Sequence, residues 1–112
     1  MGSLPCARAC AVAYAAGMRV ALCQLPISPE PAINLDRVTE AVASAARQGA
    51  DLAVLPEATQ ARFGGDLRAA AEPLDGAFGT GLAALARDSR VALVAGVFEP
   101  APGGADSELI DL

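Results

Sequence analysis

The sequence contains no histidine, no lysine and no tryptophan, and aromatic residues make up only 4% of its 112 residues. Histidine and lysine often act as general bases, so acid–base chemistry in this chain falls to its carboxylates. With few aromatic side chains and many alanines, burial of the core is expected to depend on valine, leucine and isoleucine. The length suffices for one compact domain with a modest core.

The charged residues are unbalanced. All eight basic residues are arginines, and thirteen acids give a net charge of −5. Proteins that bind nucleic acid need a clustered basic face to neutralise phosphates, whereas these arginines are spread along the chain. The composition therefore argues against a nucleic-acid partner. No apolar run approaches the roughly eighteen residues needed to cross a bilayer, so no membrane contact is expected.

The cysteines are Cys6, Cys10 and Cys23, and their spacing lacks the second pair of ligands that a zinc site needs. An odd number of cysteines without an evident secretory context favours reduced thiols in a cytoplasmic protein. Residues 1–17 have the outline of a targeting segment, but their single arginine and mostly alanine apolar stretch are weak signals. We interpret residues 1–17 as a disordered or non-native extension.

A regular pattern of strands follows this extension. Apolar runs predict strands over residues 19–25, 52–55 and 91–98. The first is apolar enough to be buried on both faces, and the last is the strongest strand signal in the chain. Helical patterns lie between the runs, so the order is β-α-β-α-β. This order predicts an α/β fold with a parallel sheet over residues 18–100. Residues 101–112 are predicted to form an irregular tail.

The helices carry recognisable end signals. Asn34 can cap the first helix, and Gly49 is placed to end it as the residue after the C-cap. A short helix is predicted over residues 67–72. A longer helix is expected to open at Thr80 or Gly81.

Residues 49–57 (GADLAVLPE) carry the clearest chemical signal. A short buried strand ends in a proline and then in Glu57, and α/β proteins usually place their chemistry at this end of a strand. Without histidine or lysine, Glu57 is the best-placed general base. Glu99 holds a second strand-end position and could line the same pocket, although its place before Pro100 favours a solvated acid.

Residues 76–81 (GAFGTG) are superficially similar to a phosphate-binding glycine loop. They follow a turn and not a strand, and their glycine order differs from that of nucleotide-binding loops. Nucleotide binding is therefore not favoured.

Several stretches, taken in order, resemble the start of the nitrilase superfamily, the carbon–nitrogen hydrolases. They are residues 18–25 (MRVALCQL), 34–35 (NL), 49–57, 73–76 (PLDG) and 91–96 (VALVAG). The resemblance covers residues 18–100, about a third of a complete family domain. It implies the N-terminal β-α-β-α-β portion of a four-layer α-β-β-α sandwich. Members of this family commonly assemble as homo-oligomers.

The resemblance also implies a reaction: hydrolysis of a non-peptide carbon–nitrogen bond in a small amide or nitrile substrate, with no cofactor and no metal. The family uses a Glu-Lys-Cys triad, in which the glutamate is general base to the thiol, the lysine stabilises the tetrahedral intermediate and the cysteine forms a thioester. The motif match assigns the glutamate to Glu57.

The other two members of the triad do not carry over. The chain has no lysine and no match to the family's nucleophile motif, and Cys23 lies mid-strand where a small apolar side chain is wanted. We therefore expect an N-terminal fragment that is inactive alone. Two alternatives stay open: a small α/β ligand-binding module, and a non-catalytic protein that interacts with a full-length homologue.

Overall fold

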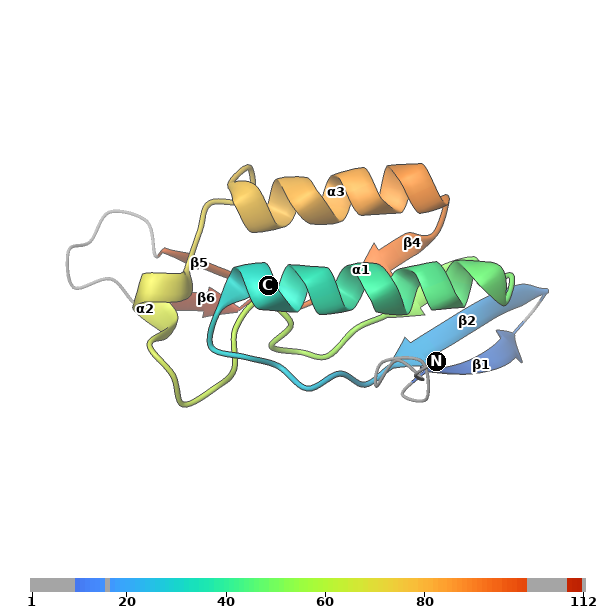
Figure 1. Ribbon diagram of the computed structural model, residues 1–112, viewed down its shortest axis with the longest axis horizontal. Helices are drawn as coiled ribbons and strands as arrows, with labels where there is room; N and C mark the ends of the chain where they lie inside the picture. Colours follow the sequence, from blue (N-terminus) through green and yellow to red (C-terminus); the bar gives the residue numbers. More distant parts are fainter. Residues whose placement is uncertain (1–9, 16, 101–108, 112) are drawn as a thin grey trace.

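The computed structural model describes residues 10–15, 17–100 and 109–111. Helices and strands alternate along most of this part of the chain (Figure 1). In order they are β1 (Cys10–Ala15), β2 (Met18–Cys23), α1 (Pro31–Arg47), β3 (Leu52–Val54), α2 (Leu67–Ala70), α3 (Ala77–Ser89), β4 (Ala92–Val94), β5 (Phe98–Pro100) and β6 (Leu109–Asp111).

The main sheet has the order β1-β2-β3-β4. Strands β2, β3 and β4 are parallel, with Ala21 opposite Ala53 and Ala53 opposite Leu93. Strand β1 is antiparallel to β2, and β5 and β6 form a separate antiparallel pair. The parallel strands and their connecting helices confirm the predicted α/β class.

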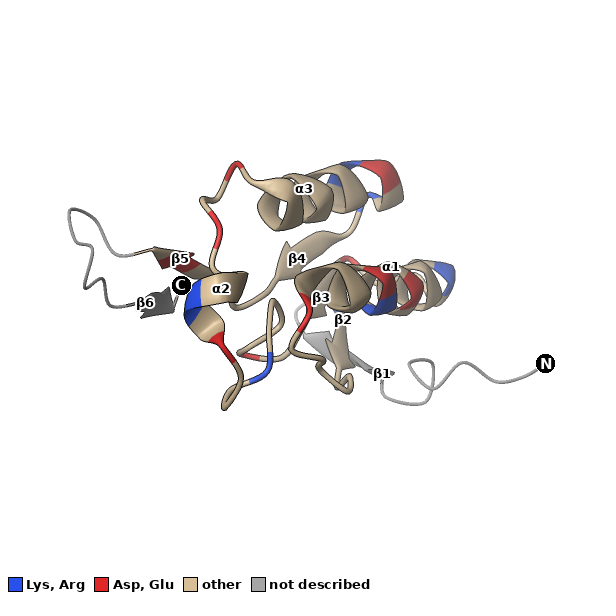
Figure 2. Cartoon of the chain, turned by 60° about the vertical axis from the view of Figure 1, so that its left-hand side comes forward, with Lys and Arg blue, Asp and Glu red and all other residues tan. Residues whose placement is uncertain are grey.

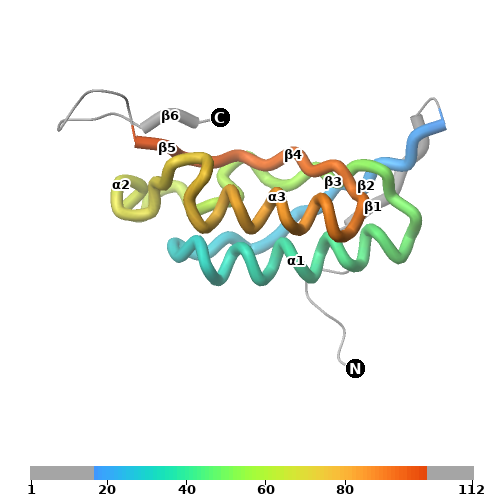
Figure 3. Tube along the Cα trace, turned by 90° about the horizontal axis from the view of Figure 1, so that it is seen from above, coloured from blue at the N-terminus to red at the C-terminus, as the bar shows by residue number. Residues whose placement is uncertain are grey.

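Helices α1 and α3 lie side by side on one face of the main sheet (Figure 3). Their inner surfaces and the sheet enclose the core. Many of the core residues are alanines, which let the α1 backbone approach the sheet closely. The buried core cluster contains Ala21, Cys23, Val38, Ala41, Val42, Ala45, Ala50, Ala53, Leu55 and Val91.

Strand β1 lies within the range interpreted as an extension before Met18. Gly17 has a φ of +81°, a conformation that suits the tight turn between β1 and β2. The turn pairs Ala15 with Met18 and lets β1 cover the edge of β2. Residues 10–15 thus differ from the expected extension, while residues 1–9 and 16 lie outside the described residues.

The first helix begins earlier than its predicted cap. Helix α1 starts at Pro31, whose fixed φ suits the first helical position, so Asn34 lies within the helix. The cap prediction for Asn34 is therefore wrong, because its buried side chain serves a tertiary contact instead. The prediction for Gly49 is confirmed: it follows the C-cap with a φ of +80°.

Helix α3 also begins before its predicted start. The Glu72 carboxylate accepts a hydrogen bond from the Phe78 amide at 2.8 Å, so the preceding loop supplies the cap that the local sequence lacks. The short helix predicted over residues 67–72 is α2, and Asp66 caps it by accepting from the Ala69 amide at 3.1 Å.

The strand predicted over residues 91–98 is two strands, β4 and β5. The chain leaves the main sheet near Gly96, where it passes against another segment described below. Strand β6 falls in the predicted irregular tail, of which residues 101–108 and 112 lie outside the described residues.

Most charged residues lie on the helices and loops, and strands β3 and β4 carry none (Figure 2). Arg19 in β2 and Glu99 in β5 are charged residues on strands. Among the described residues, no helix is both long enough and apolar enough to pass through a membrane.

Candidate active site

Glu57 lies just beyond the carboxyl end of β3, as predicted. The Leu55 amide donates to the Val94 carbonyl at 2.8 Å, so pairing with the β4 segment extends past the end of β3. The side chain of Glu57 is exposed, and no side chain in the described ranges donates a hydrogen bond to it. The carboxylate is thus presented to solvent at the strand end, where it can accept a proton from an approaching group.

The loop after Glu57 is buried, although it has no regular structure. Thr59 and Gln60 are 0% and 1% exposed. The Thr59 hydroxyl donates to the Pro56 carbonyl, which closes a tight turn around Glu57. The polar groups of this loop are therefore satisfied inside the protein and not by solvent.

Gln60 joins this loop to two other elements. Its Nε2 donates to the Ala70 carbonyl of α2 at 2.6 Å, and its Oε1 accepts from the Phe98 amide of β5 at 2.9 Å. The donor and the acceptor of this buried amide are thus both hydrogen-bonded. The two bonds stabilise the contact and fix the orientation of the side chain.

Asn34 holds the same loop from the side of α1. Its Nδ2 donates to the Gln60 carbonyl at 2.8 Å and to the Ser28 carbonyl at 2.7 Å. Its Oδ1 accepts from the Ser28 amide, also at 2.7 Å. A single buried amide therefore ties the loop before α1 to the loop after Glu57.

Gly96 approaches the Glu57 backbone very closely. A Cβ atom built on Gly96 would lie 1.3 Å from the Glu57 carbonyl oxygen, so no side chain fits there. The Gly96 carbonyl accepts from the Gln60 amide at 3.3 Å, and the Gly96 amide donates to the Pro56 carbonyl at 3.5 Å. This contact explains why the predicted strand over residues 91–98 is interrupted.

Comparison with known proteins identifies the family of this chain. The family model described as carbon-nitrogen hydrolase matches residues 19–109, which is most of the chain. The chain belongs to the carbon–nitrogen hydrolase family. The nitrilase resemblance is thereby confirmed, and the alternative of an unrelated ligand-binding module is not favoured.

Two curated proteins of Mycobacterium tuberculosis are similar to this family member. They are Hydrolase MT0498 of strain CDC 1551 / Oshkosh and Hydrolase Rv0480c of strain ATCC 25618 / H37Rv. Each is 41% identical over 87 residues, which cover 78% of this chain and 31% of the relative. The chain thus spans about a third of the length of the curated relatives it matches.

The other candidate residues take up structural positions in this carbon–nitrogen hydrolase segment. Cys23 is 3% exposed and packs in the core between the sheet and α1, as expected for a small apolar residue. The Glu99 carboxylate accepts from the Leu74 amide at 3.1 Å and so organises the loop before α3. Cys6 lies outside the described residues, and Cys10 lies in β1.

The glycines of residues 76–81 serve packing. A Cβ on Gly79 would lie 1.9 Å from the Leu74 carbonyl oxygen, and one on Gly81 would lie 2.5 Å from the Leu35 side chain. The start of α3, where a phosphate would bind, already holds the Glu72 carboxylate. A negative charge at this position opposes anion binding, which agrees with the sequence interpretation.

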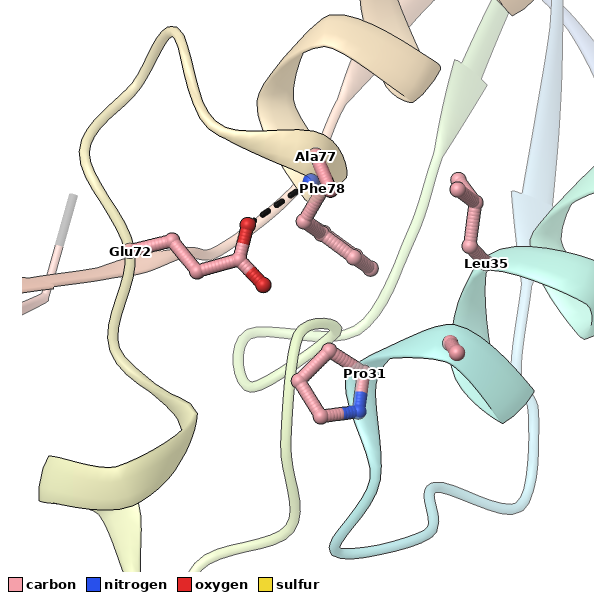
Figure 4. A pocket seen from close by; sticks show the side chains of 6 residues that line it. Pro31, Leu35, Glu72, Ala77 and Phe78 are labelled. Carbon is pink, nitrogen blue, oxygen red and sulfur yellow. Dashed lines mark hydrogen bonds between the residues drawn. The ribbon is translucent and has the colours of Figure 1, made fainter.

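An apolar pocket of about 120 Å³ lies between the starts of α1 and α3 (Figure 4). Pro31, Leu35 and Phe78 form its apolar walls. Among the described residues, Glu72 is the only ionisable one that lines it, and this carboxylate caps α3. Of the described residues, no three His, Cys, Asp or Glu side chains cluster in a way that could hold a metal ion.

The residues that sequence reasoning missed are Gln60, Asn34 in its tertiary role, and Gly96. One signal for Gln60 was present: it lies in an alanine-rich stretch (ATQA) directly after the strand-end acid. Polar residues in such an apolar stretch are candidates for buried hydrogen bonding.

Proposed function

We propose that this chain is the N-terminal segment of a carbon–nitrogen hydrolase and that it supplies Glu57 as the general base. The observation that carries the proposal is the position of Glu57: an exposed carboxylate on a buried, hydrogen-bonded loop at the carboxyl end of a parallel strand. Membership of the family supports this role. The substrate is a small amide or nitrile, and no nucleic acid or membrane takes part.

In the proposed reaction, Glu57 takes the proton of a cysteine thiol as the sulfur attacks the carbon of the substrate. A lysine ammonium stabilises the negative charge that develops on the tetrahedral intermediate. The tetrahedral intermediate of an amide collapses to a thioester as its C–N bond breaks, and Glu57 returns the proton to the departing amine. Glu57 then takes a proton from the water that hydrolyses the thioester and releases the thiol. The cysteine and lysine come from outside these 112 residues: the sequence has no lysine, and Cys23 is a core residue. Cys6 and Cys10 lie outside the residues that match the family.

The proposal includes the four-layer sandwich. Alternate residues of a strand point to opposite faces of its sheet. On the face opposite α1 and α3, the residues of β2, β3 and β4 are all apolar. Two rows cross this face in register: Val20, Leu52 and Ala92, and then Leu22, Val54 and Val94. Leu22 and Val94 are 49% and 52% exposed in this chain. A second sheet of the same hydrolase packs here and covers both rows.

The remaining features of the proposal follow the family. The intact hydrolase forms homo-oligomers and acts in the cytoplasm, without a cofactor. The 112-residue chain alone does not turn over substrate, since the nucleophile and the lysine are supplied elsewhere.

The test is ammonia release from a panel of amides and nitriles, measured for residues 1–112 and for a hydrolase that contains them. We expect no turnover from the short chain. In the hydrolase, Glu57→Gln lowers kcat by about 10²–10⁴-fold, the range for loss of a general base. Glu99→Gln is the matched control: this acid lies within β5, where its carboxylate accepts from the Leu74 amide, so we expect the activity to be unchanged.

Two results count against the proposal. Thiol-dependent turnover by residues 1–112 that survives Glu57→Gln would refute both the inactivity of the chain and the role of Glu57. Full activity of Glu57→Gln in the hydrolase would refute the general-base role alone.

A further inference from the structure

We infer that Gln60 and Gly96 are positioning residues, which fix the backbone of Glu57 so that its exposed carboxylate is held for proton transfer. The inference rests on the proposed role of Glu57 as general base. A general base must be held within a fraction of an ångström of its working geometry, and the supporting residues set that precision. Among the described residues, the hydrogen bonds around Glu57 are made by the backbone of its own loop, by β4 and the segment after it, and by the Gln60 side chain.

Strand β4 and the segment after it hold the backbone on both sides of Glu57. Before Glu57, the Leu55 amide donates to Val94 at 2.8 Å and the Pro56 carbonyl accepts from Gly96 at 3.5 Å. After Glu57, the Gln60 amide donates to Gly96 at 3.3 Å. The chain enters and leaves Glu57 along the same neighbouring segment, which leaves its backbone little freedom to shift.

Gly96 makes this arrangement possible. Its missing side chain lets it pass against the Glu57 carbonyl, where a Cβ would lie 1.3 Å from the oxygen. The obstructing atom is backbone, so a larger residue can be accommodated only if the Glu57 backbone or the β4 segment moves. Any substitution of Gly96 therefore disturbs the packing of this segment against the proposed base.

Gln60 fixes the far end of the loop. Its side chain bridges α2 and β5 through Ala70 and Phe98, and its carbonyl accepts from Asn34. The side chain is uncharged and 1% exposed, so it makes no contact with a substrate in solution. Gln60 therefore influences catalysis only by setting the position of Glu57.

The first experiment compares two glycine variants in a hydrolase that contains this chain. Gly96→Ala and Gly79→Ala both place a Cβ against a backbone carbonyl, that of Glu57 in the first variant and that of Leu74 in the second. We expect Gly96→Ala to lower kcat by about 100-fold with little change in KM, the loss typical of a displacement of about 1 Å. Gly79→Ala is expected to lower the melting temperature and leave kcat close to that of the parent.

The second experiment is a rescue at Gln60. Gln60→Met removes both side-chain hydrogen bonds at nearly constant volume. In Gln60→Glu, the protonated carboxyl can still donate to Ala70 and accept from Phe98, whereas the ionised form cannot donate. We expect hydrogen exchange of residues 57–62 to match the parent for Gln60→Glu at low pH. At high pH, exchange of these residues in Gln60→Glu should be faster than in the parent at the same pH. In Gln60→Met it should be faster than in the parent at every pH.

The outcomes separate the two proposals. Parent-like kcat and parent-like exchange of residues 57–62 in folded Gly96→Ala and Gln60→Met would overturn the positioning role. If either variant fails to fold, the decision falls to Gln60→Glu: exchange of residues 57–62 that does not depend on pH, relative to the parent, would overturn the role equally. An active Glu57→Gln refutes the general base itself and is measured independently of these variants.

Discussion

At the scale of single residues, Asn34 shows how one buried amide connects distant parts of the chain. It is 0% exposed and bonds to Ser28 and Gln60. Asn34→Ala leaves the Ser28 amide and the Gln60 carbonyl without these partners, so we expect unfolding free energy to fall by about 2–3 kcal/mol. Urea denaturation followed by circular dichroism measures the loss.

The control for Asn34 is Thr39→Ala on the same helix. Thr39 is exposed, and its hydroxyl donates to the Leu35 carbonyl of its own helix at 2.8 Å. Removing this hydroxyl should change the free energy of unfolding by no more than about 0.5 kcal/mol. Equal midpoints for the two variants would show that the Asn34 bonds contribute nothing specific.

At the scale of elements, the start of α3 depends on a residue outside the helix. The Glu72 carboxylate accepts from the Phe78 amide, and its charge also suits the positive end of the helix dipole. We expect Glu72→Ala to cost about 1 kcal/mol of unfolding free energy, as for loss of an N-cap. Hydrogen exchange of the first turn of α3 should accelerate, while that of the α3 C-terminal turn stays the same.

Asp75→Ala is the matched control for this cap. Asp75 is an exposed acid in the same loop, and its backbone carbonyl, not its side chain, accepts from Thr80. If hydrogen exchange of the first turn of α3 becomes as fast in Asp75→Ala as in Glu72→Ala, the cause is a general effect of loop charge and not the loss of a cap.

At the scale of the whole molecule, the uncovered sheet face dominates the behaviour expected of the isolated chain. An apolar face of two registered rows is a site for association. We expect the paired substitution Leu22→Thr and Val94→Thr to reduce binding of a hydrophobic dye and to raise the concentration at which residues 1–112 aggregate. Leu74→Thr, at a 55% exposed leucine in a loop, should change neither.

In the longer hydrolase the same pair of substitutions should lower the stability of the folded protein. If a second sheet covers this face, the two hydroxyls become buried and the melting temperature falls. A melting temperature that is unchanged in the hydrolase would contradict the proposed sandwich.

Much of the fold could be predicted from local patterns. The apolar runs located β2, β3 and β4, and the residues GADLAVLPE placed Glu57 at a strand end. The helix starts were predicted less well, because α1 relies on Pro31 and α3 on the remote Glu72. The interruption at Gly96 could not be predicted, since it depends on contact with a segment far away in the sequence.

The sequence by itself determined the α/β class, the family and the place of Glu57 at the end of its strand, because periodicity and short motifs are local properties of the chain. Only the tertiary structure showed what holds Glu57 in place. Asn34, Gln60 and Gly96 come from separate parts of the sequence and meet around one loop. Hydrogen bonds between buried groups, and the fit of a backbone against a glycine, exist only after the chain has folded.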